Sequence, residues 1–145
     1  MNDTSGPVTV LTSEQCWESL GRQELGRLVT RVGNVLDVFP VNYVVDERSV
    51  LFRTAPGSKL FELTVSDEVL FEVDDHSDVD AWSVVVRGHA HALTSSADVE
   101  RADTLPLVPW IPTLKYTYVR IVPAAVSGRR FARGPEPDRY GIQSY

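Results

Sequence analysis

The sequence predicts a mainly β fold, an antiparallel β-barrel with a few short helices. Its apolar residues alternate with polar ones at a period of two, in short stretches bounded by glycine, proline, asparagine or aspartate. The helical stretches are few, and they do not alternate regularly with the strands as in a parallel α/β sheet. The chain has 145 residues, the usual size of one domain, and shows no internal repeat.

The N-terminal part is expected to contain a flexible segment, a helix and a strand. Residues 1–11 are mostly small and polar, so we expect them to be flexible. Thr12 and Gln15 have the spacing of a capping box, which predicts a helix over about 13–22. The apolar period then changes to two, which predicts a strand over 27–32.

Two further strands complete an antiparallel meander. A Gly-Asn turn at 33–34 precedes a strand over 35–45, which Pro40 interrupts. A proline inside a strand is typical of an edge or a bulge. A polar turn at 46–48 leads into the third strand, over 49–54.

The middle of the chain is expected to form a short helix and two strands. The Ala-Pro-Gly sequence after the third strand breaks the sheet, and Ser58 is a suitable N-cap for a helix that carries Leu60 and Leu63. Alternating residues predict a fourth strand over 69–73. An acidic loop, 74–80, and a long fifth strand, 81–93, follow.

The C-terminal part is expected to contain one more helix and two strands. Ser95 or Ser96 caps the helix, which runs to about residue 104, and a proline-rich stretch with Trp110 follows. The strands are expected over 116–122 and 126–131. The tail, 133–145, is polar and rich in proline and glycine. We therefore assign residues 12–132 to one domain.

Composition excludes several classes of function. The net charge of −6 argues against a general nucleic-acid-binding protein and against attachment to anionic lipid. No apolar run approaches the length of a membrane span, and the N-terminus does not resemble a signal peptide, so we expect a cytoplasmic protein. Cys16 is the only cysteine, which rules out an internal disulfide. Its place on a predicted helix beside Trp17 favours the core.

The most informative stretch for chemistry runs from the third strand into the following helix. Helix N-termini present free N–H groups and a partial positive charge, which suit an anion. Arg53 and Thr54 end the strand, while Ser58 and Lys59 begin the helix. Together they would make a phosphate-binding site. The alternative is a capped helix beside solvated charges.

The strand interrupted by Pro40 is the second candidate. Pro40 bends the strand, and backbone groups beside such a bend can face a planar heterocycle. Asn42 offers both a donor and an acceptor. The alternative is an ordinary edge strand with a bulge.

These stretches occur in an order that resembles the pyridoxamine 5'-phosphate oxidase-like flavin-binding proteins, from about residue 13 to residue 131. The matching strings are Gly-Arg-Leu at 26–28, Pro-Val-Asn-Tyr at 40–43, Phe-Arg-Thr at 52–54, Gly-Ser-Lys-Leu at 57–60, Phe-Glu-Val-Asp at 71–74, Trp-Ser-Val-Val-Val-Arg-Gly at 82–88, Pro-Trp at 109–110, Arg-Ile at 120–121 and Gly-Arg-Arg at 128–130. The resemblance is closer to the general flavin-binding branch than to the vitamin oxidases, whose substrate-binding histidine and arginine pattern has no match here.

The resemblance implies a split β-barrel, a homodimer and two flavin sites at the subunit interface. It implies FMN as the cofactor, with deazaflavin or haem as the alternatives. The residues that match the family's flavin-binding positions are Pro40, Val41, Asn42, Tyr43, Arg53, Thr54, Ser58 and Lys59. Trp110 resembles an aromatic residue of the family that approaches a flavin site, either that of its own subunit or that of the partner.

Three other groups of polar residues could bind a metal, haem or an anion, or could simply lie at the surface. His89 and His91 share one strand face with Arg87 and could ligate a metal or haem, but a solvent-facing stripe is favoured. The acidic loop 74–80 lacks the pattern of a calcium loop, so we predict no metal site. The arginines of 129–133 could touch an anionic ligand or pair with the acidic loops.

The function expected from these residues is that of a flavin-dependent oxidoreductase with an unknown small-molecule substrate. The flavin would carry the electrons, and the protein would supply position and electrostatics, so no side chain is assigned as catalytic. The alternative is a module that stores or senses a flavin without turnover.

Overall fold

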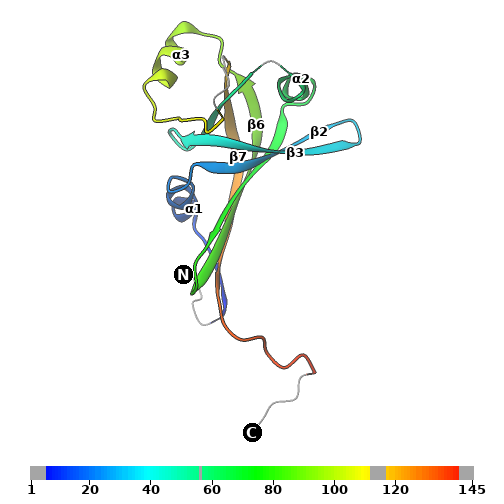
Figure 1. The fold of residues 1–145 in the computed structure, drawn as a ribbon, viewed down its shortest axis with the longest axis vertical. Coiled ribbons are helices and arrows are strands. Elements are labelled where there is room, and N and C mark those ends of the chain that lie inside the picture. The colour runs from blue at the N-terminus through cyan, green and yellow to red at the C-terminus, as the bar shows by residue number, and fades with distance from the viewer. Residues whose placement is uncertain (1–5, 56, 112–116, 141–145) are drawn as a thin grey trace.

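The described residues form one antiparallel sheet that closes on itself, with three short helices around it (Figure 1). The structure is a computed structural model that describes residues 6–55, 57–111 and 117–140. The strands are β1 (Val8–Val10), β2 (Leu25–Val32), β3 (Val35–Val45), β4 (Val50–Thr54), β5 (Glu68–His76), β6 (Asp80–Ala92) and β7 (Thr117–Ala132), and the helices are α1 (Ser13–Leu20), α2 (Ser58–Val65) and α3 (Ser96–Asp103). The predicted mainly β class is confirmed.

The long strand β7 closes the barrel. The strand order is β1-β7-β4-β3-β2-β5-β6, and β6 also pairs with β7. On one edge β7 pairs with all 13 residues of β6. On its other edge β4 pairs with Thr117–Ile121 and β1 with Arg129–Phe131. Figure 1 shows β6 and β7 side by side along the length of the barrel.

In the structure β7 is one strand, where the sequence predicts two. Pro123 lies between the two predicted strands, and a proline cannot donate to a ladder. In the structure Pro123 pairs with Gly88, and a register shift between Arg87 and Gly88 accommodates it. Such an irregularity lets a strand bend and continue.

Two other predicted segments, the flexible N-terminus and the acidic loop, also differ from the structure. Val8–Val10 form β1, although residues 1–11 were expected to be flexible, because the free edge of β7 supplies a partner that a three-residue pattern cannot reveal. Residues 1–5 lie outside the described part. The acidic loop is shorter than predicted: β5 extends to His76 and β6 begins at Asp80, since exposed acidic residues fit a two-stranded ribbon.

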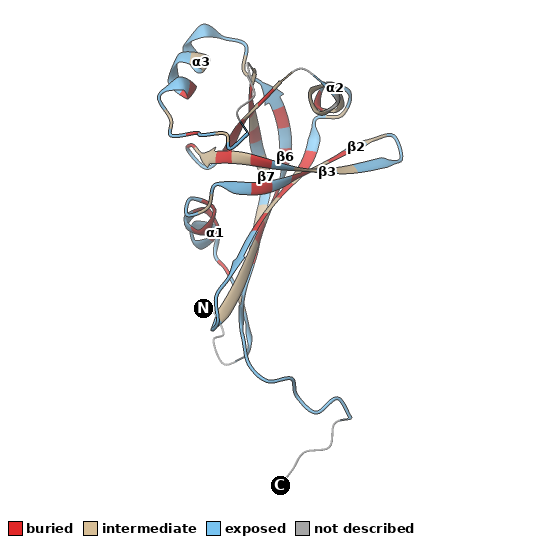
Figure 2. Ribbon diagram, in the orientation of Figure 1, coloured by how far each residue is buried: buried red, intermediate tan, exposed pale blue. Residues whose placement is uncertain are grey.

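The core fills the barrel and the space beneath α1 (Figure 2). The Tyr43 and Phe71 rings meet edge to face, with centroids 4.9 Å apart. Helix α1 begins at the predicted capping box of Thr12 and Gln15 and buries Cys16, so the thiol is a core group and burial raises its pKa. A smaller cluster lies under α3 and consists of Leu51, Ala102, Leu107 and Tyr118.

None of the helices in the described part of the chain has the length and apolar character needed to span a membrane.

Gly88 tests how tightly β6 and β7 are packed at the register shift. A Cβ at Gly88 would lie 2.2 Å from the carbonyl oxygen of Val122, and this backbone atom cannot move aside as a flexible side chain could. We expect Gly88→Ala to lower the free energy of unfolding by about 1–3 kcal/mol, the usual range for overpacking. Chemical denaturation would measure the loss. Gly134→Ala, at a position with no atom within 4 Å, is the matched control and should have little effect. Equal stability of the two variants would contradict this packing.

Candidate functional site

A pocket of about 90 Å³ lies where β3, β4, α2 and the segment before residue 112 meet. It is lined by Pro40, Val41, Asn42, Arg53, Lys59, Pro109 and Ile111. Five of these residues belong to the set predicted to bind a flavin, although they come from three separate elements. The fold therefore brings together most of the two stretches that the sequence pointed to.

The pocket opens beside Pro40 because of the way in which β3 is paired. Every residue of β2 pairs with β3, but β4 pairs only with Tyr43–Val45. Among the described strands, Pro40 thus has a partner on one side only. This agrees with the edge position expected for a proline in a strand.

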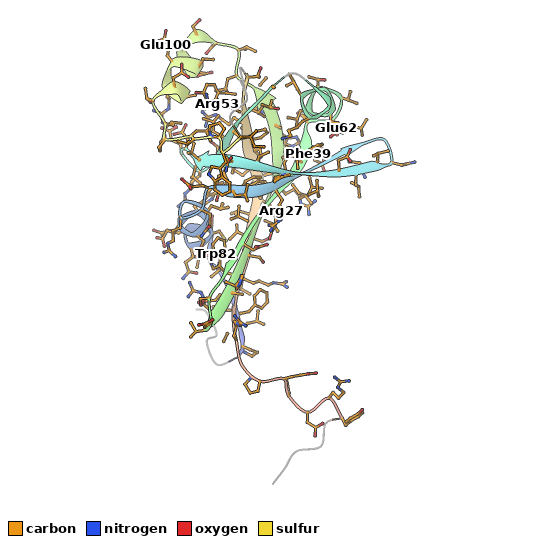
Figure 3. All side chains as sticks on the ribbon, viewed as in Figure 1. Arg27, Phe39, Arg53, Glu62, Trp82 and Glu100 are labelled. Carbon is orange, nitrogen blue, oxygen red and sulfur yellow. The ribbon has the colours of Figure 1, made fainter. Side chains whose placement is uncertain are left out.

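Arg53 is the residue on which the character of the pocket depends. It lies near the end of β4 (Figure 3). Its guanidinium carbon is 5.7 Å from the centre of the Tyr118 ring. Its Nε is buried and has no hydrogen-bond partner among the described residues. A buried donor without an acceptor is costly and rare in native proteins. The geometry therefore calls for an acceptor from outside these residues.

The N-terminus of α2 supplies the second positive element. The helix begins at Ser58, and the N-cap is Gly57, so the prediction that Ser58 is the cap was wrong by one residue. Glycine brings no side chain to the first N–H groups, and the cap makes no side-chain hydrogen bond. Lys59 lines the pocket, with Nζ 5.1 Å from the centre of the Phe39 ring. The Ser58 side chain is outside the described atoms.

Asn42 ties β3 to the segment that carries Trp110. Its Nδ2 donates to the carbonyl of Glu24 at 3.1 Å, and its Oδ1 accepts from the backbone N–H of Trp110 at 2.8 Å. The Trp110 side chain is 58% exposed beside the pocket. Asn42 therefore shapes the wall of the pocket through two hydrogen bonds of its own.

Two of the predicted binding residues turn their side chains away from the pocket. Tyr43 is buried in the core, where its hydroxyl donates to the carbonyl of Leu20 and burial raises its pKa. The buried Thr54 hydroxyl donates to the carbonyl of Ala55 at 3.2 Å. If these two residues contact a ligand in the pocket, their backbones are the groups that can reach it.

The histidines of β6 occupy the outer surface, as predicted. His89 and His91 are exposed, and His89 Nδ1 lies 3.6 Å from a carboxylate oxygen of Asp67. Within the described ranges no group of three or more His, Cys, Asp or Glu residues is placed to hold a metal ion.

The structure also reveals a charged cluster that the sequence analysis did not find. Arg27 pairs in register with Pro40 on one side and Glu72 on the other, so these residues share the outer face of the sheet. Its Nη1 lies 2.6 Å from a carboxylate oxygen of Glu72 and 3.2 Å from one of Asp74. These residues meet only because β2 pairs with β5 in this register, and no local pattern in the sequence predicts that register.

Glu72 titrates unusually within this cluster. Its pKa is raised from the ordinary 4.5 to about 7, chiefly by burial and further by hydrogen bonding to and repulsion from Asp74, while Arg27 acts in the opposite direction. Near neutral pH the outer face next to Pro40 therefore carries a carboxyl group that can hold or release a proton.

Comparison with known proteins gives the same picture of the family and the fold. The sequence model of the family described as Pyridoxamine 5'-phosphate oxidase matches residues 12–130. A crystal structure from Corynebacterium glutamicum is 43% identical, covers 92% of this chain and 100% of its own, and has a TM-score of 0.81. The structure described as the FAD-binding protein from Mycobacterium smegmatis is 42% identical, with coverages of 86% and 98% and a TM-score of 0.76. An uncharacterized protein from Mycobacterium tuberculosis is 48% identical over 96 residues, which are 66% of this chain and 87% of that protein.

Glu72 should make the stability of the fold depend on pH. Because its folded pKa of about 7 lies above the ordinary 4.5, the folded state binds the proton more tightly than the unfolded state. The free energy of unfolding should therefore fall as the pH rises from about 4.5 to 7. Glu72→Gln should remove this loss, so that the variant exceeds the wild type in stability at pH 8 but not at pH 4.5. Denaturation curves at both pH values measure this, with the exposed Glu68→Gln as control. Parallel pH profiles for wild type and Glu72→Gln would rule it out.

Proposed function

The chain belongs to the pyridoxamine 5'-phosphate oxidase family, and on that premise we propose that it binds a flavin nucleotide in the pocket beside Arg53. The observation that carries the proposal is the buried Nε of Arg53, which lacks an acceptor among the described residues. A phosphate oxygen would satisfy it through a charge-assisted hydrogen bond, and guanidinium groups suit phosphate geometry.

The proposed arrangement assigns a separate task to each side of the pocket. Arg53, Lys59 and the N-terminus of α2 bind the phosphate, with Thr54 and Ser58 flanking it. The backbone of 40–43 lies along the isoalloxazine ring, and Asn42 keeps that strand joined to the Trp110 segment. The support for this arrangement is that the two cations, Arg53 and Lys59, and residues 40–42 of β3 line one pocket.

FMN is the flavin that we propose first, because a single phosphate group matches the small cationic pocket. FAD is the second candidate, since the Mycobacterium smegmatis relative is described as a FAD-binding protein. Both molecules carry a phosphate group next to the ribityl chain. Arg53 would therefore serve either one.

We propose further that the protein acts as a flavin-dependent oxidoreductase with a small-molecule substrate. A bound flavin supplies the electron transfer, and the residues of this chain hold its phosphate and orient its ring. A flavin store or sensor without turnover is the alternative. Reduction of the bound flavin by a nicotinamide under anaerobic conditions would favour the enzyme.

We propose that a second copy of the chain completes the site. The pocket of about 90 Å³ is smaller than the roughly 300–1,000 Å³ of pockets that enclose whole ligands. Beside it Trp110 and Ile111 are 58% and 64% exposed. Exposed apolar groups that gather at a ligand site suit an interface, and two-fold dimers are the commonest assemblies.

Removal of the guanidinium tests the phosphate contact. We expect Arg53→Ala to weaken FMN binding by about tenfold to a hundredfold, the range for a hydrogen bond to a charged group. Riboflavin, which has no phosphate, should bind the wild type weakly and the variant equally weakly. Quenching of flavin fluorescence gives both dissociation constants.

Arg139→Ala is the control for this experiment. It removes the same charge from the C-terminal tail, where Arg139 is 3.7 Å from Glu136, and it should leave both affinities unchanged. Equal affinity of the wild type for FMN and riboflavin would refute the phosphate contact. An equal loss of both flavins in Arg53→Ala would instead indicate damage to the fold.

The shared site predicts that flavin and subunits dissociate together. A ligand that binds only the assembled state shifts the assembly equilibrium by mass action. Analytical ultracentrifugation over a dilution series should show a dimer that persists to lower protein concentration when FMN is in excess. A monomer that keeps one flavin per chain at every concentration would show that the site needs no partner.

A further inference from the structure

Tyr118 lies directly opposite Arg53 in the barrel. The pairing of β4 with β7 places the two residues in register, so their side chains stand on the same face of the sheet. The guanidinium lies over the Tyr118 ring at 5.7 Å, a distance at which cation and aromatic face attract each other.

A residue of α3 fixes the Tyr118 side chain through a hydrogen bond. Its hydroxyl donates to Asp103 Oδ1 at 2.6 Å. Burial raises the pKa of Tyr118 and Asp103 raises it further, while Arg53 lowers it, so the hydroxyl keeps its proton at neutral pH. Tyr118 also belongs to a buried apolar cluster with Leu51, Ala102 and Leu107.

The helix that carries Asp103 is anchored at a second point. Arg101 Nη2 lies 2.7 Å from Oδ1 of the buried Asp46. The other carboxylate oxygen of Asp46, Oδ2, lies 3.1 Å from Arg120 Nη1 on β7. Helix α3 is therefore attached to the barrel at two points, at Tyr118 through Asp103 and at Asp46 through Arg101. The ring has little freedom to turn.

Arg53 contrasts with this rigid support. Within the described ranges the structure gives its guanidinium the Tyr118 ring as a contact and its Nε no acceptor. An arginine side chain has many rotamers, and their loss on binding weakens affinity. A stacked guanidinium has lost much of that freedom before a ligand arrives.

We propose that Tyr118, anchored by Asp103, is a positioning residue that orients Arg53 toward the phosphate of the bound flavin. The proposal rests on the function proposed above and adds that α3 supports the phosphate site without touching it. Tyr118 acts through Arg53 and needs no contact with the flavin.

A double-mutant cycle on purified full-length protein tests this proposal, with FMN and riboflavin as the two probes. Tyr118→Leu removes the ring and should weaken FMN binding by between about twofold and thirtyfold, with riboflavin binding changed by less than about twofold. In the Arg53→Ala background the same substitution should have no further effect on FMN. A purely structural role would weaken both flavins alike.

Asp103 supplies a second variant that leaves the core intact, because its side chain is at the surface. Asp103→Ala should lower the preference for FMN over riboflavin by about twofold to tenfold. Asp103→Asn keeps an oxygen that can accept from the Tyr118 hydroxyl, and it should restore most of the preference.

The outcomes separate the two proposals. A wild type that prefers FMN strongly, with a preference that neither Tyr118→Leu nor Asp103→Ala alters, overturns the positioning role but leaves the phosphate site standing. Losses that remain full in the Arg53→Ala background overturn it as well. A wild type with no preference for FMN overturns the phosphate site and the positioning role together.

Discussion

The pairing of β7 on both of its edges is the constraint on which the rest of the structure depends. Its 16 residues span the barrel, and β6 runs along one edge for its whole length. The other edge is divided between β4 and β1. Without pairing on both edges of β7 the sheet would stay open between β4 and β6, and α1 would lose the joined surface of β7 and β6 on which it packs.

The same pairing determines the character of the candidate site. It places Arg53 opposite Tyr118 near the end of β4, where the chain leaves the sheet for α2. The short pairing of β4 with β3 leaves Pro40 beside this point. Among the described residues the buried Arg53 Nε has no acceptor, and an unpaired buried donor opposes folding. The flavin proposed for this pocket would supply the acceptor.

Local patterns in the sequence were sufficient for the elements and for part of the site. The alternation along β6 correctly placed Val84 and Val86 inside and His89 outside, because a strand has a strict period of two. The Thr12 capping box was also confirmed, since its partners are three residues apart. Arg53 and Lys59 were predicted to act together, and they do line one pocket.

Features that depend on the register of distant strands could not be predicted in this way. Tyr118 supports Arg53 only because β7 pairs with β4, and Glu72 meets Arg27 only because β5 pairs with β2. The Tyr43 side chain points into the core because it packs on Phe71. The sequence of residues 40–43 alone does not predict this contact. The strand β1 exists because β7 leaves an edge for it.

The central claim is that the Nε of Arg53 donates to the phosphate of a flavin. A crystal structure of the protein with FMN tests it most directly. The account predicts a phosphate oxygen within about 3.2 Å of this nitrogen, with the guanidinium still stacked on Tyr118. FMN bound with its phosphate elsewhere, and the Arg53 Nε still without an acceptor, would contradict it.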